Sequence, residues 1–135
     1  METIFMPVKN GYVTSGFGNR MLNGKVQFHG GIDFGTKETN KTIFAPLSGI
    51  VRIKGKSLTF GNRIWVELPD KTYYVLAHMS ILFDTYKEND IITKGQKVGI
   101  MGNTGLSFGV HLHLEFRVDP SDPRTAINSP YFKQF

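Results

Sequence analysis

Polar and apolar residues alternate most regularly in the segment from Gly109 to Val118. Positions 111, 113, 115 and 117 are polar, and positions 112, 114, 116 and 118 are apolar. A period of two is typical of a β-strand with one buried face. His111 and His113 should therefore point to the same side of the strand, about 7 Å apart along it. Two imidazoles on one face suggest a metal site or an acid–base site.

Other short apolar runs, separated by glycine, proline and polar residues, also predict strands. The expected strands are 49–54, 63–68, 72–78, and two short ones within 91–102. Pro69-Asp70 should close a hairpin between the second and third of them. We expect a polar turn at 19–25, leave a helical turn open at 79–90, and expect the aromatic tail to pack on the body. The pattern predicts a mainly β protein, a single domain of antiparallel sheets spanning residues 1–135.

Composition narrows the classes of function. The chain has 135 residues, no cysteine and a formal net charge of +5, so disulfides, cysteine-based zinc sites and thiol catalysis are excluded. The first residues, Met1 to Pro7, do not resemble a signal peptide, and no run of apolar residues is long enough for a membrane span. The basic residues are scattered rather than clustered, so we do not expect nucleic-acid binding.

The four histidines stand in informative contexts. His29 precedes Asp33 by four residues in a glycine-rich segment, where we expect the glycines to permit a tight turn. His78 ends an apolar strand, and His111 and His113 share a strand face. Without cysteine, zinc is bound by imidazole and carboxylate. His29, Asp33 and one strand histidine would supply three ligands, and the other two histidines would be free to transfer protons.

These residues, in this order, resemble the M23 zinc metallopeptidases, which include lysostaphin-like and LytM-like enzymes that cut the peptides of bacterial peptidoglycan. The resemblance extends over nearly the whole chain. Besides the histidines and Asp33, it rests on four further segments. They are Thr14-Ser15-Gly16-Phe17-Gly18-Asn19-Arg20, Ala45-Pro46-Leu47-Ser48-Gly49-Ile50-Val51, Gly95-Gln96-Lys97-Val98-Gly99 and Gly102-Asn103-Thr104-Gly105. Each segment alone is a weak signal, but their joint order is specific.

The resemblance implies that one Zn²⁺ is bound by His29, Asp33 and His113. It places His78 and His111 beside the reacting water and the scissile carbonyl, with a substrate groove over the site. The division of proton transfer between these two histidines stays open. Metal-assisted amide hydrolysis is the implied reaction.

The residues around the site leave further hypotheses open. Asn19, Arg20 and Tyr74 are candidates for the groove. Glu115 either orients His113 or is a solvated strand charge, and Trp65 is expected in the core. Val110 departs from the proline common in the family at its position, and Leu76 from a frequent aromatic.

The function implied is that of a zinc endopeptidase acting on the cross-bridge or stem peptide of peptidoglycan, outside the cell, in the cell wall or with a phage. The chain would then be a monomeric catalytic domain of a larger protein, and its positive charge would suit anionic cell-wall polymers. The main alternative is a non-catalytic LytM-like binding or activator domain. A lipoyl-type carrier lacks its lysine motif here, and a nucleic-acid-binding β-domain lacks interleaved basic and aromatic residues.

Overall fold

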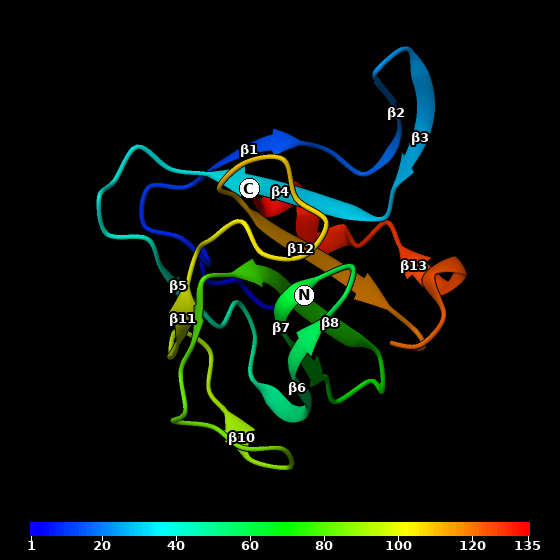
Figure 1. Cartoon of the computed structure of the whole chain (residues 1–135). Coiled ribbons are helices and arrows are strands. Elements are labelled where there is room, and N and C mark those ends of the chain that lie inside the picture. The colour runs from blue at the N-terminus through cyan, green and yellow to red at the C-terminus, as the bar shows by residue number, and fades with distance from the viewer.

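The computed structural model describes residues 1–135, and its regular structure is almost entirely β-strand (Figure 1). The strands are β1 (Tyr12–Ser15), β2 (Gly18–Leu22), β3 (Lys25–His29), β4 (Gly31–Gly35), β5 (Thr42–Phe44), β6 (Gly49–Ser57), β7 (Gly61–Glu67), β8 (Tyr73–Met79), β9 (Ile81–Leu82), β10 (Ile91–Ile92), β11 (Lys97–Ile100), β12 (Leu112–Arg117) and β13 (Ala126–Ile127). Two 3₁₀ helices, η1 (Pro123–Thr125) and η2 (Pro130–Gln134), follow β12. The prediction of a mainly β protein is confirmed.

The largest sheet places the histidine strand at its centre. Its order is β1-β4-β12-β8-β7-β6-β10, with β13 also paired to β12, and every pairing is antiparallel. All six residues of β12 are buried. The sequence predicted a strand with one buried face, and this was wrong, because loops and neighbouring side chains cover the polar face as well. That face forms the floor of the site described below.

A smaller sheet, of order β5-β11-β9, packs with the large sheet around one core. The main apolar cluster contains Ile43 of β5 and Val98 of β11 together with Leu76 and Leu112 of the large sheet. The aromatic tail packs against this cluster, as expected. Trp65 is buried in a separate small cluster with Val75 and Ala77, which confirms its assignment to the core.

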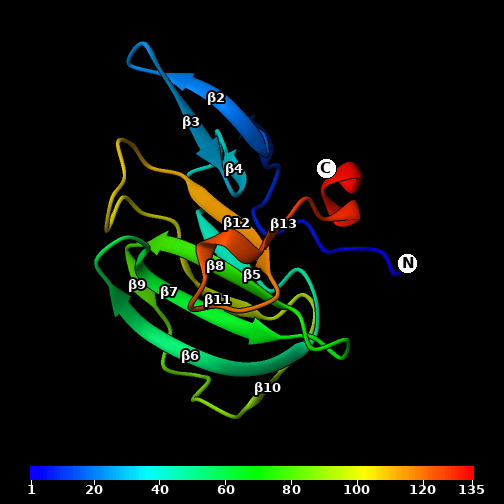
Figure 2. The ribbon, with the colours of Figure 1, turned by 90° about the vertical axis from the view of Figure 1, so that its right-hand side faces the viewer.

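The hairpin of β2 and β3 projects from the body and rises above the site (Figures 1 and 2). The sequence predicted only a polar turn at 19–25. The turn is confined to Asn23 and Gly24, which both have positive φ (53° and 76°), as in hairpin turns of type I′. Most residues of the two strands are exposed. Their apolar face, with Met21, Val26 and Phe28, is short and open to solvent, so it gives no strong strand signal.

The segments outside the sheets are loops, turns and two short 3₁₀ helices. The helical turn considered at 79–90 does not form, and the chain there makes β9 and two turns. The only helices are the short η1 and η2, and none is long and apolar enough to cross a membrane.

A histidine and aspartate centre

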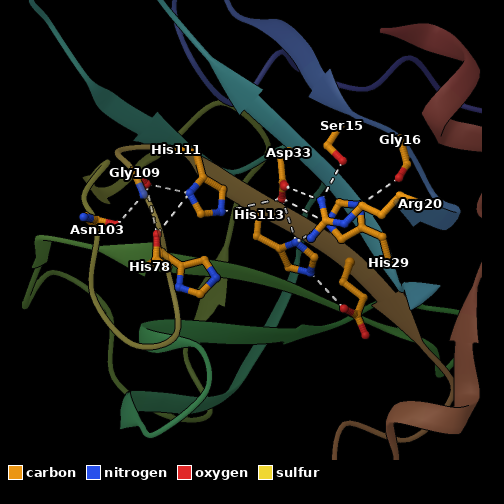
Figure 3. Close-up of polar contacts among 12 residues, drawn as sticks. Ser15, Gly16, Arg20, His29, Asp33, His78, Asn103, Gly109, His111 and His113 are labelled. Carbon is orange, nitrogen blue, oxygen red and sulfur yellow. Dashed lines mark hydrogen bonds and ion pairs between the residues drawn. The ribbon is translucent and has the colours of Figure 1, made fainter. Parts of the chain in front are cut away.

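Three side chains from two adjacent strands and a hairpin end meet at one point (Figure 3). His29 ends β3, Asp33 lies in β4, and His113 lies in β12 directly opposite Asp33 in the register. Asp33 Oδ1 is 2.9 Å from His113 Nδ1 and 3.2 Å from His29 Nε2. The two nitrogens are themselves 3.2 Å apart. All three residues are buried, with at most 8% of their surface exposed.

Gly31 allows the two strands to approach this closely. A Cβ at this position would lie 2.2 Å from the carbonyl oxygen of Leu114, which is a severe clash with backbone. The sequence suggested that the glycines after His29 permit a tight turn, but neither Gly30 nor Gly31 has a positive φ. What they provide is space for β12.

The outer nitrogens of the two histidines face acceptors. His29 Nδ1 donates to the carbonyl of Gly16 at 2.7 Å, and His113 Nε2 donates to Glu115 Oε1 at 2.8 Å. A neutral imidazole carries only one N–H, so the nitrogens that meet Asp33 present lone pairs. When both rings are neutral, three electron-pair donors therefore converge with no proton between them, and such a set is stabilised by a cation.

The donor set fits zinc. Two imidazoles and a carboxylate are accepted ligands, and a tetrahedral ion with bonds of about 2.0–2.1 Å would hold neighbouring ligand atoms roughly 3.3 Å apart. The observed separations of 2.9–3.2 Å are close to this value. Without a metal ion, burial raises the pKa of Asp33, but hydrogen bonds donated by ring nitrogens of His113 and His29 outweigh that effect and keep the pKa well below its usual range. A bound cation would take the place of those protons. Asp33 is therefore an ionised ligand at neutral pH.

His78 and His111 lie together on the opposite side of Asp33, with ring centroids 4.8 Å apart. His111 Nε2 is 3.7 Å from Asp33 Oδ1, and its Nδ1 donates to the carbonyl of Gly109 at 2.8 Å. His78 Nδ1 donates to the carbonyl of Thr104 at 2.6 Å. These bonds leave the Nε2 atom of each ring as an acceptor. Burial lowers the pKa of His78 to about 4 against the opposing bond to Thr104, so His78 is neutral at physiological pH.

The backbone of His78 is strained. Its φ is 64°, in the left-handed region that non-glycine residues rarely adopt. Backbone hydrogen bonds hold it there, from its N–H to Phe60 and from Thr104 to its carbonyl. Strain of this kind persists where the surrounding structure imposes it, and it is common at functional sites.

Two charged residues support His113 from below. Glu115 accepts from His113 with one oxygen and from Arg117 Nε with the other. The Arg117 guanidinium lies 5.3 Å from the ring centroid of Phe60 and 5.2 Å from that of Trp65, and it donates to the carbonyl of Pro120. Glu115 is thus buried and bound to His113, and the alternative of a solvated charge was wrong. Arg117 was missed, although it continues the same period-two face.

A groove of about 640 Å³ lies over the centre. The β2–β3 hairpin forms one wall, and the loops around Phe60 and at 106–109 form the other. Arg20 lines this groove, as the sequence suggested. Asn19 does not line it.

The assignment of Tyr74 to the groove was wrong. Tyr74 is fully buried in the core, where its hydroxyl donates to the carbonyl of Leu47 at 2.8 Å. Burial raises its pKa well above the usual range. Tyr74 pairs with Phe116 in the register, on the opposite face of the sheet from His113 and Glu115.

Comparison with known proteins now places the chain in a family. The profile of peptidase family M23 matches residues 27–125, and the chain belongs to this family. An uncharacterised metalloprotease of Haemophilus influenzae is 31% identical over 73% of this chain and 20% of its own length. The peptidoglycan DD-endopeptidase ShyC of Vibrio cholerae is 28% identical over 84% of this chain and 27% of its own. The chain thus spans less than a third of the length of these curated relatives.

Solved structures share the fold. The catalytic domain of the antimicrobial peptidase lysostaphin from Staphylococcus simulans aligns with a TM-score of 0.76 and 29% identity, covering 88% of this chain and 89% of that domain. A chain of the SpoIIQ–SpoIIIAH pore-forming complex aligns with a TM-score of 0.75 and 25% identity, covering 94% of this chain and 88% of that one. The fold therefore occurs both in a peptidase and in a protein assembly.

Proposed function

We propose that this chain is a zinc-dependent endopeptidase domain that hydrolyses peptide bonds in the cross-bridge or stem peptide of bacterial peptidoglycan. One observation supports this above all: His29 Nε2, His113 Nδ1 and the carboxylate of Asp33 lie 2.9–3.2 Å from one another, as three ligands of one metal ion would. Membership of the M23 peptidase family supports the reaction class, and the similarity to a peptidoglycan DD-endopeptidase of Vibrio cholerae supports the substrate.

His29, Asp33 and His113 would hold the metal. A bound Zn²⁺ supplies a Lewis acid that activates water and polarises a carbonyl at neutral pH. Glu115 and Gly16 fix the two imidazoles so that their lone pairs face inward. The ligand geometry is therefore fixed when the protein folds, before substrate binds.

His78 and His111 would transfer protons. Each ring donates Nδ1–H to a backbone carbonyl, so each presents Nε2 to the groove. A neutral Nε2 accepts a proton from the attacking water and can later return it to the leaving amine. Because His111 is nearer to the ligand carboxylate, we propose it as the main base, with His78 beside it.

The surroundings of the reaction follow from the same proposal. A groove between two walls suits an extended peptide, and the formal charge of +5 favours anionic cell-wall polymers. We propose that the domain acts at the cell wall, as part of a larger protein, and as a monomer.

Digestion of purified peptidoglycan tests the function. Zinc-restored protein is incubated with peptidoglycans of different cross-bridge type, and the released peptides are identified by mass spectrometry. We expect new amine termini from at least one type, and none after chelation or in the His111→Ala variant. Protein with one equivalent of zinc that releases nothing from any type would contradict the proposal.

The second candidate is a non-catalytic binding or activator domain. The similarity to a chain of the SpoIIQ–SpoIIIAH complex favours it, because that chain acts within a protein assembly. Against it, three potential ligands and two further histidines are assembled here in one groove. A binding domain would need none of these residues in place.

A further inference from the structure

One cation in the groove is not used by the reaction proposed above. Arg20 lies on β2, in the hairpin wall, and about a third of its side chain is exposed. Its Nη1 donates to Ser15 Oγ at 2.7 Å and lies 3.5 Å from Asp33 Oδ2. Its Nε is buried and has no hydrogen-bond partner, so donors for a ligand would come from the exposed part of the guanidinium. A guanidinium offers five donors, so most of its binding capacity is unused beside the metal ligands.

The other groove charges do not neutralise Arg20 when the proposed metal is bound. The ionisable lysine, arginine, aspartate and glutamate residues that line the groove are Arg20, Arg117, Asp33 and Glu115, which sum to zero. Arg117 and Glu115 pair with each other. Asp33 would share its charge with a divalent cation, which leaves the groove floor with a net charge of about +2. A groove of this charge favours an anionic group on the substrate.

The neighbours of Arg20 suit a carboxylate. Gln27 of β3 lies directly opposite Arg20 in the hairpin register and also lines the groove. It adds a carboxamide donor beside the guanidinium fork, which binds carboxylates in a bidentate manner. Across the groove, Leu106 and Phe108 are 64% and 87% exposed. An aliphatic chain ending in a carboxylate would contact both walls.

We propose that Arg20, with Gln27 beside it, binds a free carboxylate of the substrate next to the scissile bond. The inference rests on the proposed function and names its substrate class: stem peptides or cross-links that contain a dicarboxylic diamino acid or a free terminal carboxylate. Bridges made of glycine alone lack such a group within the chain. Arg20 is thus a specificity-determining residue, distinct from the metal ligands and the proton-transferring histidines.

Synthetic peptides provide the test. Three forms of one cross-linked peptide are compared: both carboxylates free, the side-chain carboxylate of the diamino acid amidated, and the terminal carboxylate amidated. Affinity for the matching product peptides is measured by calorimetry, which needs no turnover, and kcat/KM is measured on the cross-linked forms. The two amidated forms identify which carboxylate is bound.

The variants are Arg20→Gln, Arg20→Lys and Lys25→Gln. The last removes one positive charge from the same hairpin at a residue outside the groove lining, so it controls for net charge. We expect amidation of one carboxylate to weaken binding and kcat/KM of the unmodified protein about 10- to 100-fold, the usual effect of losing a charge-assisted hydrogen bond. Arg20→Gln should produce the same loss on the free form and no further loss on the amidated form. Arg20→Lys should recover part of the lost affinity and kcat/KM. Lys25→Gln should leave both quantities unchanged.

Three results would overturn the inference. The first is equal binding of free and amidated peptides by the unmodified protein. The second is an equal loss on all peptides in Arg20→Gln, since that is the effect expected if Arg20 only supports Asp33. The third is a loss in Lys25→Gln as large as in Arg20→Gln. Failure of the proposed function is distinguishable, because it would abolish cleavage of every peptide while leaving the difference in binding affinity.

Discussion

Replacing Glu115 with glutamine tests how the buried charges hold His113. The carboxylate accepts from His113 Nε2 and from Arg117 Nε, and Glu115 and Arg117 are only 4% and 7% exposed. In Glu115→Gln the amide oxygen can still accept from His113, but its NH₂ group then faces the Arg117 donor. Breaking a buried pair by removing one partner costs about 3–5 kcal/mol. Arg117 would keep its hydrogen bond to the carbonyl of Pro120 and its contacts with the rings of Phe60 and Trp65. We therefore expect a cost at the lower end of this range.

A loss of about 3 kcal/mol should lower Tm by roughly 12 °C for a chain of this length. The loss of unfolding free energy is measured by urea denaturation of the metal-free protein, and the m-value should stay unchanged. Because supporting hydrogen bonds fix the ligating nitrogen, zinc affinity measured against a chromophoric chelator should fall about 10- to 100-fold. Adding Arg117→Met removes the stranded cation and should restore stability while zinc affinity stays low. A single variant with wild-type stability and zinc affinity would refute this account of His113.

Three further predictions concern the core, the strand contact and the metal. Tyr74→Phe leaves the buried carbonyl of Leu47 without its donor, so unfolding free energy should fall by about 1–3 kcal/mol; a changed KM with unchanged Tm would instead favour a groove position. Gly31→Ala places a methyl group 2.2 Å from the Leu114 oxygen, so it should abolish zinc binding. Gly16→Ala, where a Cβ would meet nothing within 4 Å, should bind zinc normally. Normal zinc binding by Gly31→Ala would contradict the packing argument. Zinc at 1,000 times its Kd should stabilise the folded chain by about 4 kcal/mol, so adding a chelator should lower Tm. A Tm that does not change with chelator would exclude a metal bound only by the folded chain.

The sequence predicted the fold class and the strands β6, β7, β8, β10, β11 and β12, because the apolar pattern is strong where these strands face the core. It missed the β2–β3 hairpin, whose strands are largely exposed and whose short apolar face does not pack on the core. It was also wrong that β12 has a solvated face. The pattern alone cannot distinguish a polar face open to water from one that is buried against a site.

The sequence could predict which residues form the candidate site, but not which side chains they contact. The spacing of His29 and Asp33 and the shared face of His111 and His113 indicated that these residues could meet. No local pattern could show that Tyr74 points into the core, because it lies in a strand buried on both faces. The partners of Glu115 and the stacking of Phe60 on His113 come from segments far apart in the chain, so they required the tertiary structure.

The metal content and turnover of His113→Ala and His111→Ala, measured side by side, test the central proposal most directly. Zinc is quantified after metal restoration, and peptide release from peptidoglycan is followed in the same preparations. The account predicts one zinc per chain in the unmodified protein, no zinc and no release in His113→Ala, and retained zinc without release in His111→Ala. Equal zinc loss in the two variants, or full zinc in His113→Ala, would contradict the assignment of His113 as ligand and His111 as proton acceptor.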